Sequence, residues 1–116
     1  MTRTKSQTGK AARNKGKRGE LEFASLCRAH GFDASRTAQC RGNTGKAGDV
    51  EGIPGVHIEV KRTEALRLYE AMAQSIRDAE AGGRGEMPIV AHRRNGEDWL
   101  IVLQAEDFFR LLGEKP

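Results

Sequence analysis

Two acidic residues and a lysine lie close together in the middle of the chain, in the segment GDVEGIPGVHIEVK at 48–61. Side chains alternate between the two faces of an extended strand, so Glu59 and Lys61 share one face. Carboxylates are preferred ligands of Mg²⁺ and Mn²⁺, and an ammonium group beside such an ion can position water or offset charge on a phosphate. Asp49, Glu59 and Lys61 therefore indicate metal-assisted hydrolysis.

Whether Asp49 and Glu59 meet depends on the register of the two strands around the turn at 53–55. A two-residue turn would pair Val50 with Glu59 and place the two acids on opposite faces. A three-residue loop instead pairs Val50 with Ile58 and Asp49 with Glu59. Only this second register gathers the apolar side chains of both strands on one face, and the glycine of the loop can supply a positive φ. The sequence therefore predicts two opposed carboxylates, which repel each other unless a cation lies between them.

Glu20 extends the apolar stripe of the first expected helix, because it precedes Phe23 and Cys27 by three and seven residues. A carboxylate on a core-facing stripe is costly without a partner, and a metal ion or its bound water would be that partner. Each acid also has an ordinary structural explanation: a solvated Glu-x-Lys pair, turn chemistry at Asp49, or a helix-end charge at Glu20. These explanations leave the grouping of the acids unaccounted for.

The elements that must position these residues alternate between the two kinds of secondary structure. We expect helices at 17–30, 65–81 and 105–112, and strands at 32–37, 48–52, 56–61, 88–92 and 99–103. The order α-β-β-β-α-β-β-α predicts an α/β fold with a mixed sheet flanked by helices. The last two strands are compact apolar runs, expected to be buried and joined by an Asn95-Gly96 turn. The apolar stripe of the helix at 65–81 is expected to be Leu68, Tyr69, Met72, Ile76 and Ala79.

Charge is distributed unevenly along the 116 residues, whose formal net charge is +4. The first 19 residues contain seven Lys and Arg and no acid, which indicates a polyanionic partner such as nucleic acid or, alternatively, a solvated leader. We expect a flexible basic arm at 1–14 and a single domain at 15–116. No apolar run reaches the ~20 residues of a membrane span. Neither a secretory signal nor a paired cysteine motif is evident, so a cytoplasmic protein with Cys27 in the core and Cys40 as a free thiol is expected.

Together these residues resemble the PD-(D/E)XK nuclease superfamily. Glu20 lies on the first helix, Asp49 begins the second strand and Glu59-Val60-Lys61 lies on the third. The pattern is most similar to archaeal-type Holliday-junction resolvases and related small phage endonucleases, over about 15–112. The segments GKRGELE at 16–22, QSIRDA at 74–79 and HRRNGEDWL at 92–100 support it. Gly48 replaces the proline of the motif. The resemblance implies a restriction-endonuclease-like fold.

The resemblance also assigns roles to residues. Asp49, Glu59 and the Val60 carbonyl would bind Mg²⁺ (with Mn²⁺ as a substitute), and Glu20 would act through water or on a second metal. Lys61 would position the attacking water. Gln74 matches a family glutamine near the site, although a helical wheel places it opposite the apolar stripe. Resolvases also have a serine or threonine near the site, for which Ser35, Thr37 and Thr44 are candidates. The expected DNA-contacting residues are Lys15, Lys17, Arg18, Arg36, Arg41, Lys46, Arg62, Arg93 and Arg94.

His57 shares the face of Glu59, and a hydrogen-bonded structural role is expected for it in preference to metal or DNA binding. The segment at 42–46 lacks the spacing of a P-loop, so no nucleotide cofactor is expected. The function expected is a metal-dependent DNA endonuclease, in particular a homodimeric resolvase of branched DNA that leaves 5′-phosphates. The alternatives are a non-specific or nicking nuclease on the same fold, an RNA-directed nuclease, and a non-catalytic DNA-binding module whose acids pair with basic residues.

Overall fold

The computed structural model describes residues 5–38 and 47–113, and these form one sheet with helices on both of its faces. The elements are α1 (Lys5–Ala29), β1 (Ser35–Arg36), β2 (Val50–Glu51), β3 (Val56–Arg62), α2 (Leu68–Gly82), β4 (Met87–Arg93), β5 (Leu100–Leu103) and α3 (Ala105–Leu111). The predicted order of elements and the α/β class are confirmed. In the part of the chain described, no helix is both long and apolar enough to cross a membrane.

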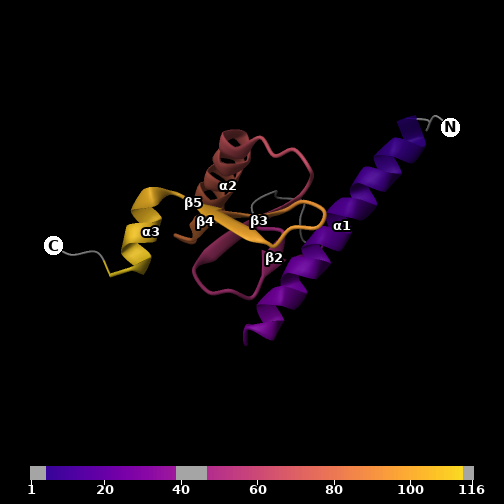
Figure 1. Cartoon of the computed structure of the whole chain (residues 1–116). Helices are drawn as coiled ribbons and strands as arrows, with labels where there is room; N and C mark the ends of the chain where they lie inside the picture. Colours follow the sequence, from indigo (N-terminus) through magenta and orange to yellow (C-terminus); the bar gives the residue numbers. More distant parts are fainter. Residues whose placement is uncertain (1–4, 39–46, 114–116) are drawn as a thin grey trace.

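The sheet has the strand order β1-β2-β3-β4-β5, and only β3 and β4 are parallel (Figure 1). The parallel pair requires a crossover, which α2 provides. Val50 pairs with Ile58, which is the register predicted from the apolar face. Gly55 has a φ of 78°, as the three-residue loop requires. Asp49 and Glu59 therefore reach the same part of the sheet.

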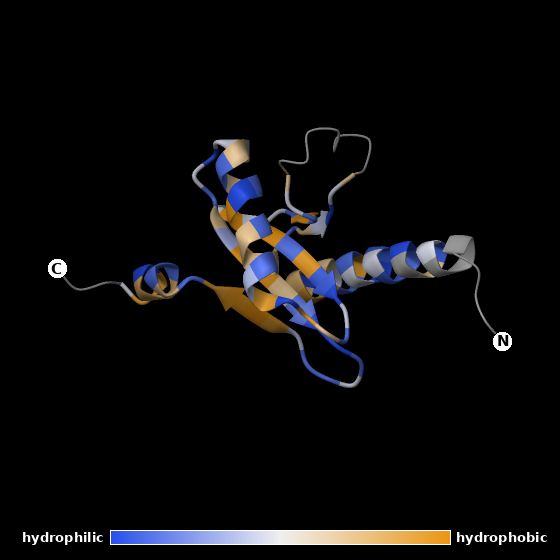
Figure 2. Ribbon diagram, turned by 90° about the horizontal axis from the view of Figure 1, so that it is seen from above, coloured by the Kyte–Doolittle hydropathy of each residue, from blue (hydrophilic) through white to orange (hydrophobic). Residues whose placement is uncertain are grey.

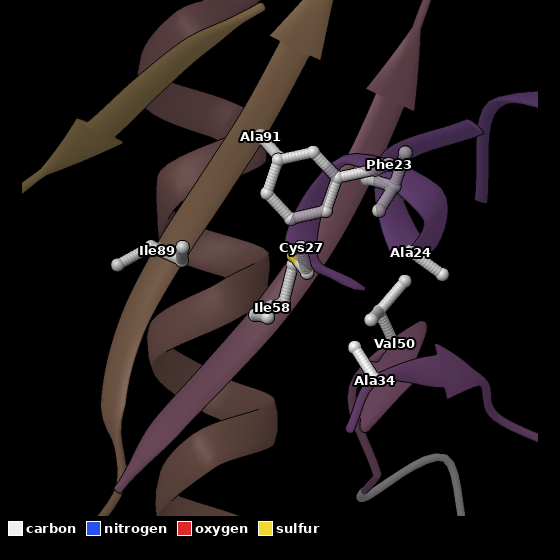
Figure 3. Close-up of a cluster of buried hydrophobic side chains, with 9 residues drawn as sticks. Phe23, Ala24, Cys27, Ala34, Val50, Ile58, Ile89 and Ala91 are labelled. Atoms are coloured by element: carbon white, nitrogen blue, oxygen red, sulfur yellow. The ribbon is translucent and has the colours of Figure 1, made fainter. Parts of the chain in front are cut away.

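The two long helices pack on opposite faces of the sheet. Phe23, Ala24 and Cys27 of α1 pack against Val50 and Ile58 in the larger core, shown in Figure 3. On the other face α2 places Ala71 and Met72 against Val90 of β4. The face that carries His57 and Glu59 is thus covered by a helix, and both side chains are buried. This burial was not predicted, because the strand pattern showed only which residues share a face.

Three elements differ from expectation. Helix α1 begins at Lys5 rather than near residue 17, so the described part of the expected arm is helical, and its N-terminal half extends beyond the sheet (Figure 1). The first strand is limited to Ser35–Arg36. The apolar run on β5 is not buried: it forms the edge of the sheet, with Leu100 and Ile101 61% and 47% exposed. The division into an arm at 1–14 and a domain at 15–116 stays a prediction.

Helix α3 stands apart from the rest of the molecule, on the side away from the N-terminus (Figure 2). Phe108 and Leu111 remain largely exposed on it. The predicted Asn95-Gly96 turn is confirmed, because Glu97 N–H donates to the Arg94 carbonyl and Gly96 has a φ of 76°. Cys27 is buried as expected, whereas Thr44, Cys40, Arg41 and Lys46 lie outside the described residues.

Candidate active site

Asp49 lies directly before β2 and is held by the backbone around it. Its amide donates to the Ile58 carbonyl at 2.7 Å, and its carboxylate Oδ2 accepts from the Val60 amide at 2.8 Å. Buried Thr37 donates through Oγ1 to the Gly48 carbonyl at 2.6 Å. Thr37, one of the three serine and threonine candidates, therefore contacts the segment bearing Asp49 through its side chain. Ile58 and Thr37 thus hold the backbone around Asp49, and the Val60 amide holds its carboxylate.

The carboxylates predicted to meet do meet. Burial raises the pKa of Asp49 to about 7, and the neighbouring charges of Glu59 and Glu20, together with a side-chain hydrogen bond to Glu59, add to the rise, against a lowering by the Val60 amide. Three acids from α1, the start of β2 and the centre of β3 are thus close enough to repel one another. Such a group is stabilised by a cation or by protonation.

Glu20 has a partner that the sequence did not reveal. Arg36 Nε donates to Glu20 Oε1 at 2.6 Å, and the side chains are 22% and 16% exposed. Helix α1 crosses β3 closely at Gly19, where an added Cβ would lie 2.5 Å from Arg62 Cβ. This close crossing brings the next residue, Glu20, to its position beside the sheet. The partner expected for Glu20 was a metal or its water. Arg36 provides at least part of the positive charge that offsets the burial of the Glu20 carboxylate.

Lys61 and Gln74 lie together, with Lys61 Nζ donating to Gln74 Oε1 at 2.9 Å. The helical wheel placed Gln74 away from the buried side of α2, and this was wrong. Small residues, Ala71, Ser75 and Ala79, face the sheet and let the helix approach closely, whereas Leu68 and Tyr69 of the expected stripe are exposed. A shallow hollow lined by Lys61, Gln74 and Arg67 opens at this point.

His57 is fully buried and hydrogen-bonded to the proposed metal ligand Glu59, with His57 Nε2 2.9 Å from Glu59 Oε1. Asp78 of α2 joins them: one potential ligand atom from each of the three residues lies within 4.8 Å of the others. Asp78 was not among the predicted site residues. Its position four residues after Gln74, on the same side of α2, is the sequence signal that could have found it.

Comparison with known proteins agrees with this geometry. No protein-family model and no curated protein sequence matches the chain. Among solved structures, the 1.6 Å structure of Archaeoglobus fulgidus Hjc, a Holliday junction resolvase from an archaeal hyperthermophile, matches with a TM-score of 0.58 and 25% sequence identity. The match covers 77% of this chain and 72% of that chain. The chain has the PD-(D/E)XK nuclease fold.

The acids around Asp49 are of a kind that binds metal ions. Oxygen ligands of this kind suit Mg²⁺ or Mn²⁺, and burial together with the neighbouring carboxylates raises the pKa of Asp49, which a bound cation would oppose. The residues present therefore fit a divalent cation held by Asp49 and Glu59. The Val60 amide is engaged by Asp49, and its carbonyl as a ligand stays a prediction.

The described residues predicted to contact DNA differ in how far the protein itself already engages them. Lys15, Arg18 and Arg62 line one hollow between α1 and the sheet, beside Glu22. Arg62 and Arg93 are both tied to the protein: Arg62 donates to Asn95 Oδ1 at 2.9 Å, and Arg93 pairs with Glu22. Lys17 and Arg94 are exposed. Arg36 pairs with Glu20, although the other N–H groups of a guanidinium can still reach a phosphate. Their contacts with DNA stay predictions.

Gly48, at the position of the motif's proline, is required by close packing in this chain. A Cβ there would lie 2.7 Å from the Ile58 carbonyl oxygen and 2.8 Å from its nitrogen. Replacing Gly48 by Ala must push this backbone away from β3, and we expect a loss of about 1–3 kcal/mol in the free energy of unfolding. Urea denaturation measures it.

Gly16→Ala is the matched control, because nothing lies within 4 Å of a Cβ at that helical glycine. It should be neutral or stabilise the protein by up to ~1 kcal/mol. An equal change in the free energy of unfolding of both variants would show that the close contact between Gly48 and Ile58 does not matter for stability.

Proposed function

We propose that this chain is a metal-dependent endonuclease that hydrolyses phosphodiester bonds in DNA. The observation that carries the proposal is the closeness of Asp49 and Glu59 on a PD-(D/E)XK fold, with Lys61 two residues after Glu59 on β3. Asp49 and Glu59 would hold Mg²⁺, for which Mn²⁺ could substitute, and Glu20 would act through water or on a second ion. The bound ion would supply Lewis-acid stabilisation of the scissile phosphate and an activated water.

The chain's own residues have separate tasks in this proposal. Lys61 shares the face of Glu59 on β3 and is held by Gln74, so its ammonium would orient the attacking water and offset charge on the phosphate. The Val60 amide fixes Asp49. The hollow beside Lys61 leaves room for a sugar-phosphate chain to approach. By the resemblance to PD-(D/E)XK nucleases, hydrolysis is proposed to leave a 5′-phosphate.

The proposed substrate is branched DNA, and a Holliday junction in particular. Its support is the likeness to a solved resolvase, together with the basic residues on α1 and β3 around the hollow of Lys15, Arg18 and Arg62. Resolving a four-way junction needs two symmetric cuts, and each chain offers one site. The active form is therefore proposed to be a homodimer.

The test is a cleavage assay with Mg²⁺ on a labelled four-way junction, a linear duplex and a single strand. Wild type should cut the junction symmetrically, and Glu59→Gln should reduce cleavage by about 10³-fold, because it removes a metal ligand. Glu106→Gln, at an exposed acid on α3, is the matched control and should cut like wild type.

Two other outcomes decide between the alternatives. Cleavage of all three substrates would keep the nuclease and contradict the junction preference. The ion pairs Glu20–Arg36 and Glu22–Arg93 fit the other candidate, a DNA-binding module whose acids serve structure. In that case no metal would support cleavage, and Glu59→Gln would leave salt-sensitive DNA binding unchanged.

A further inference from the structure

The buried cluster of His57, Glu59 and Asp78 is not explained by the proposed reaction. Phosphodiester hydrolysis with Mg²⁺ uses Glu59 but has no use for a neighbouring imidazole, since Mg²⁺ prefers oxygen ligands and keeps several waters. Nevertheless β3 places His57 on the face of Glu59, and α2 brings Asp78 to the same point. The three residues come from two elements that only the fold brings together.

Two observations indicate a ligand site rather than a simple ion pair. One potential ligand atom from each residue lies within 4.8 Å of the other two, and His57 Nε2 is already 2.9 Å from Glu59 Oε1. In addition, the imidazole is 0% exposed and its Nδ1 has no hydrogen-bond partner among the described residues; the nearest carboxylate beyond the cluster is Glu86, at 3.9 Å. Nε2 is the ring nitrogen that faces the cluster, whereas Nδ1 points toward Glu86, and a nearby carboxylate on the second nitrogen is what orients a metal-binding imidazole.

The geometry points to a second metal site, in which His57, Glu59 and Asp78 bind a Zn²⁺-class transition ion; we propose this site as distinct from that of Mg²⁺. One imidazole and two carboxylates are ligands that Zn²⁺ accepts, and an imidazole favours such ions over Mg²⁺. Ligand atoms around tetrahedral zinc lie ~3.4 Å apart, so the side chains need to close in only slightly.

Sharing Glu59 gives the site a consequence for activity. Glu59 also lies beside Asp49, so the two sites would share this one carboxylate. Zinc at the second site would draw Glu59 toward His57 and Asp78 and weaken Mg²⁺ binding. This part rests on the proposed function: zinc should inhibit Mg²⁺-dependent cleavage.

Calorimetric titration with ZnCl₂, without Mg²⁺ or DNA, tests the site itself. We expect one zinc ion per chain for wild type and at least ten-fold weaker binding for Asp78→Asn, which lies outside the proposed catalytic residues. Glu80→Gln, an exposed acid two residues further along α2, is the matched control and should bind like wild type. His57→Gln should also lose binding, and Asp78→Asn keeps the test decisive if that buried variant fails to fold.

Wild-type affinity in Asp78→Asn would overturn the proposal. So would loss of binding in His30→Gln, which would place the ion near Cys27 and His30 at the C-terminal end of α1 instead. The second measurement is zinc inhibition of cleavage at fixed Mg²⁺, which Asp78→Asn should relieve at least ten-fold. If wild type cuts no substrate, the proposed nuclease function fails, whereas the calorimetry still decides whether the zinc site exists.

Discussion

Asp49→Asn is expected to weaken Mg²⁺-dependent cleavage severely and, at the same time, to stabilise the metal-free protein at neutral and alkaline pH. The pKa of Asp49 is raised from 3.8 to about 7, mainly by burial and then by Glu59. Because the folded-state pKa of this acid is the higher one, its contribution to stability is fully present below pH 3.8 and is lost as the pH rises through 7. Asparagine carries no charge at any of these pH values and can still accept from the Val60 amide.

The loss of activity should be about 10³-fold, equivalent to about 4 kcal/mol of transition-state stabilisation, because a carboxylate ligand of the metal is removed. The gain in the free energy of unfolding at pH 8 in EDTA should reach up to about 4 kcal/mol, at 1.36 kcal/mol for each unit of pKa. Urea denaturation at pH 5 and pH 8 measures it. Wild type should lose stability between these two pH values, and Asp49→Asn should lose less.

Mg²⁺ supplies the decisive comparison. An ion that binds only the folded state stabilises it by mass action, so Mg²⁺ should raise the midpoint of thermal unfolding of wild type but not of Asp49→Asn. Asp98→Asn is the control, because this acid is exposed in the turn before β5. A response to Mg²⁺ that survives in Asp49→Asn would show that the ion binds elsewhere.

The sequence predicted the part of the site that depends on strand periodicity. Val50 and Ile58 had to pair for the apolar side chains to share a face, and this requirement alone brought Asp49 opposite Glu59. Gly55 supplied the loop conformation by the same argument. These predictions hold because burial of one face has a large effect on free energy and a one-residue slip reverses every side chain.

The remaining parts of the site depend on which helix covers which face, and a single sequence does not contain that information. Apolar periodicity on α2 predicted that Leu68 and Tyr69 face the sheet. Instead Ala71 and Ser75 pack on the sheet, because small side chains let the helix approach closely. Gln74 and Asp78 were misjudged or missed for the same reason. The early start of α1 was also missed, because its first turns lack an apolar stripe.

Lys61→Ala is expected to lower kcat by about 10²–10³-fold while leaving the Mg²⁺ concentration for half-maximal activity unchanged. The ammonium of Lys61 contributes in the transition state, where charge develops on the phosphate, and one such donor is worth about 2.7–4 kcal/mol. The proposed metal ligands Asp49 and Glu59 remain. Steady-state cleavage of a labelled junction over a range of Mg²⁺ concentrations separates the two effects, and a rise in the Mg²⁺ requirement would contradict this role for Lys61.

Gln74 should act only through Lys61, because its Oε1 accepts from Lys61 Nζ at 2.9 Å. Gln74→Leu should therefore cost about 10-fold in kcat, as for residues that orient a catalytic group. Combined with Lys61→Ala it should add nothing, since the group that it orients is then gone. Arg77→Ala removes a charge from the exposed side of the same helix and should change kcat little. Independent, multiplicative losses in the double variant would mean that Gln74 contacts the substrate directly, and the hydrogen bond to Lys61 would then be incidental to catalysis.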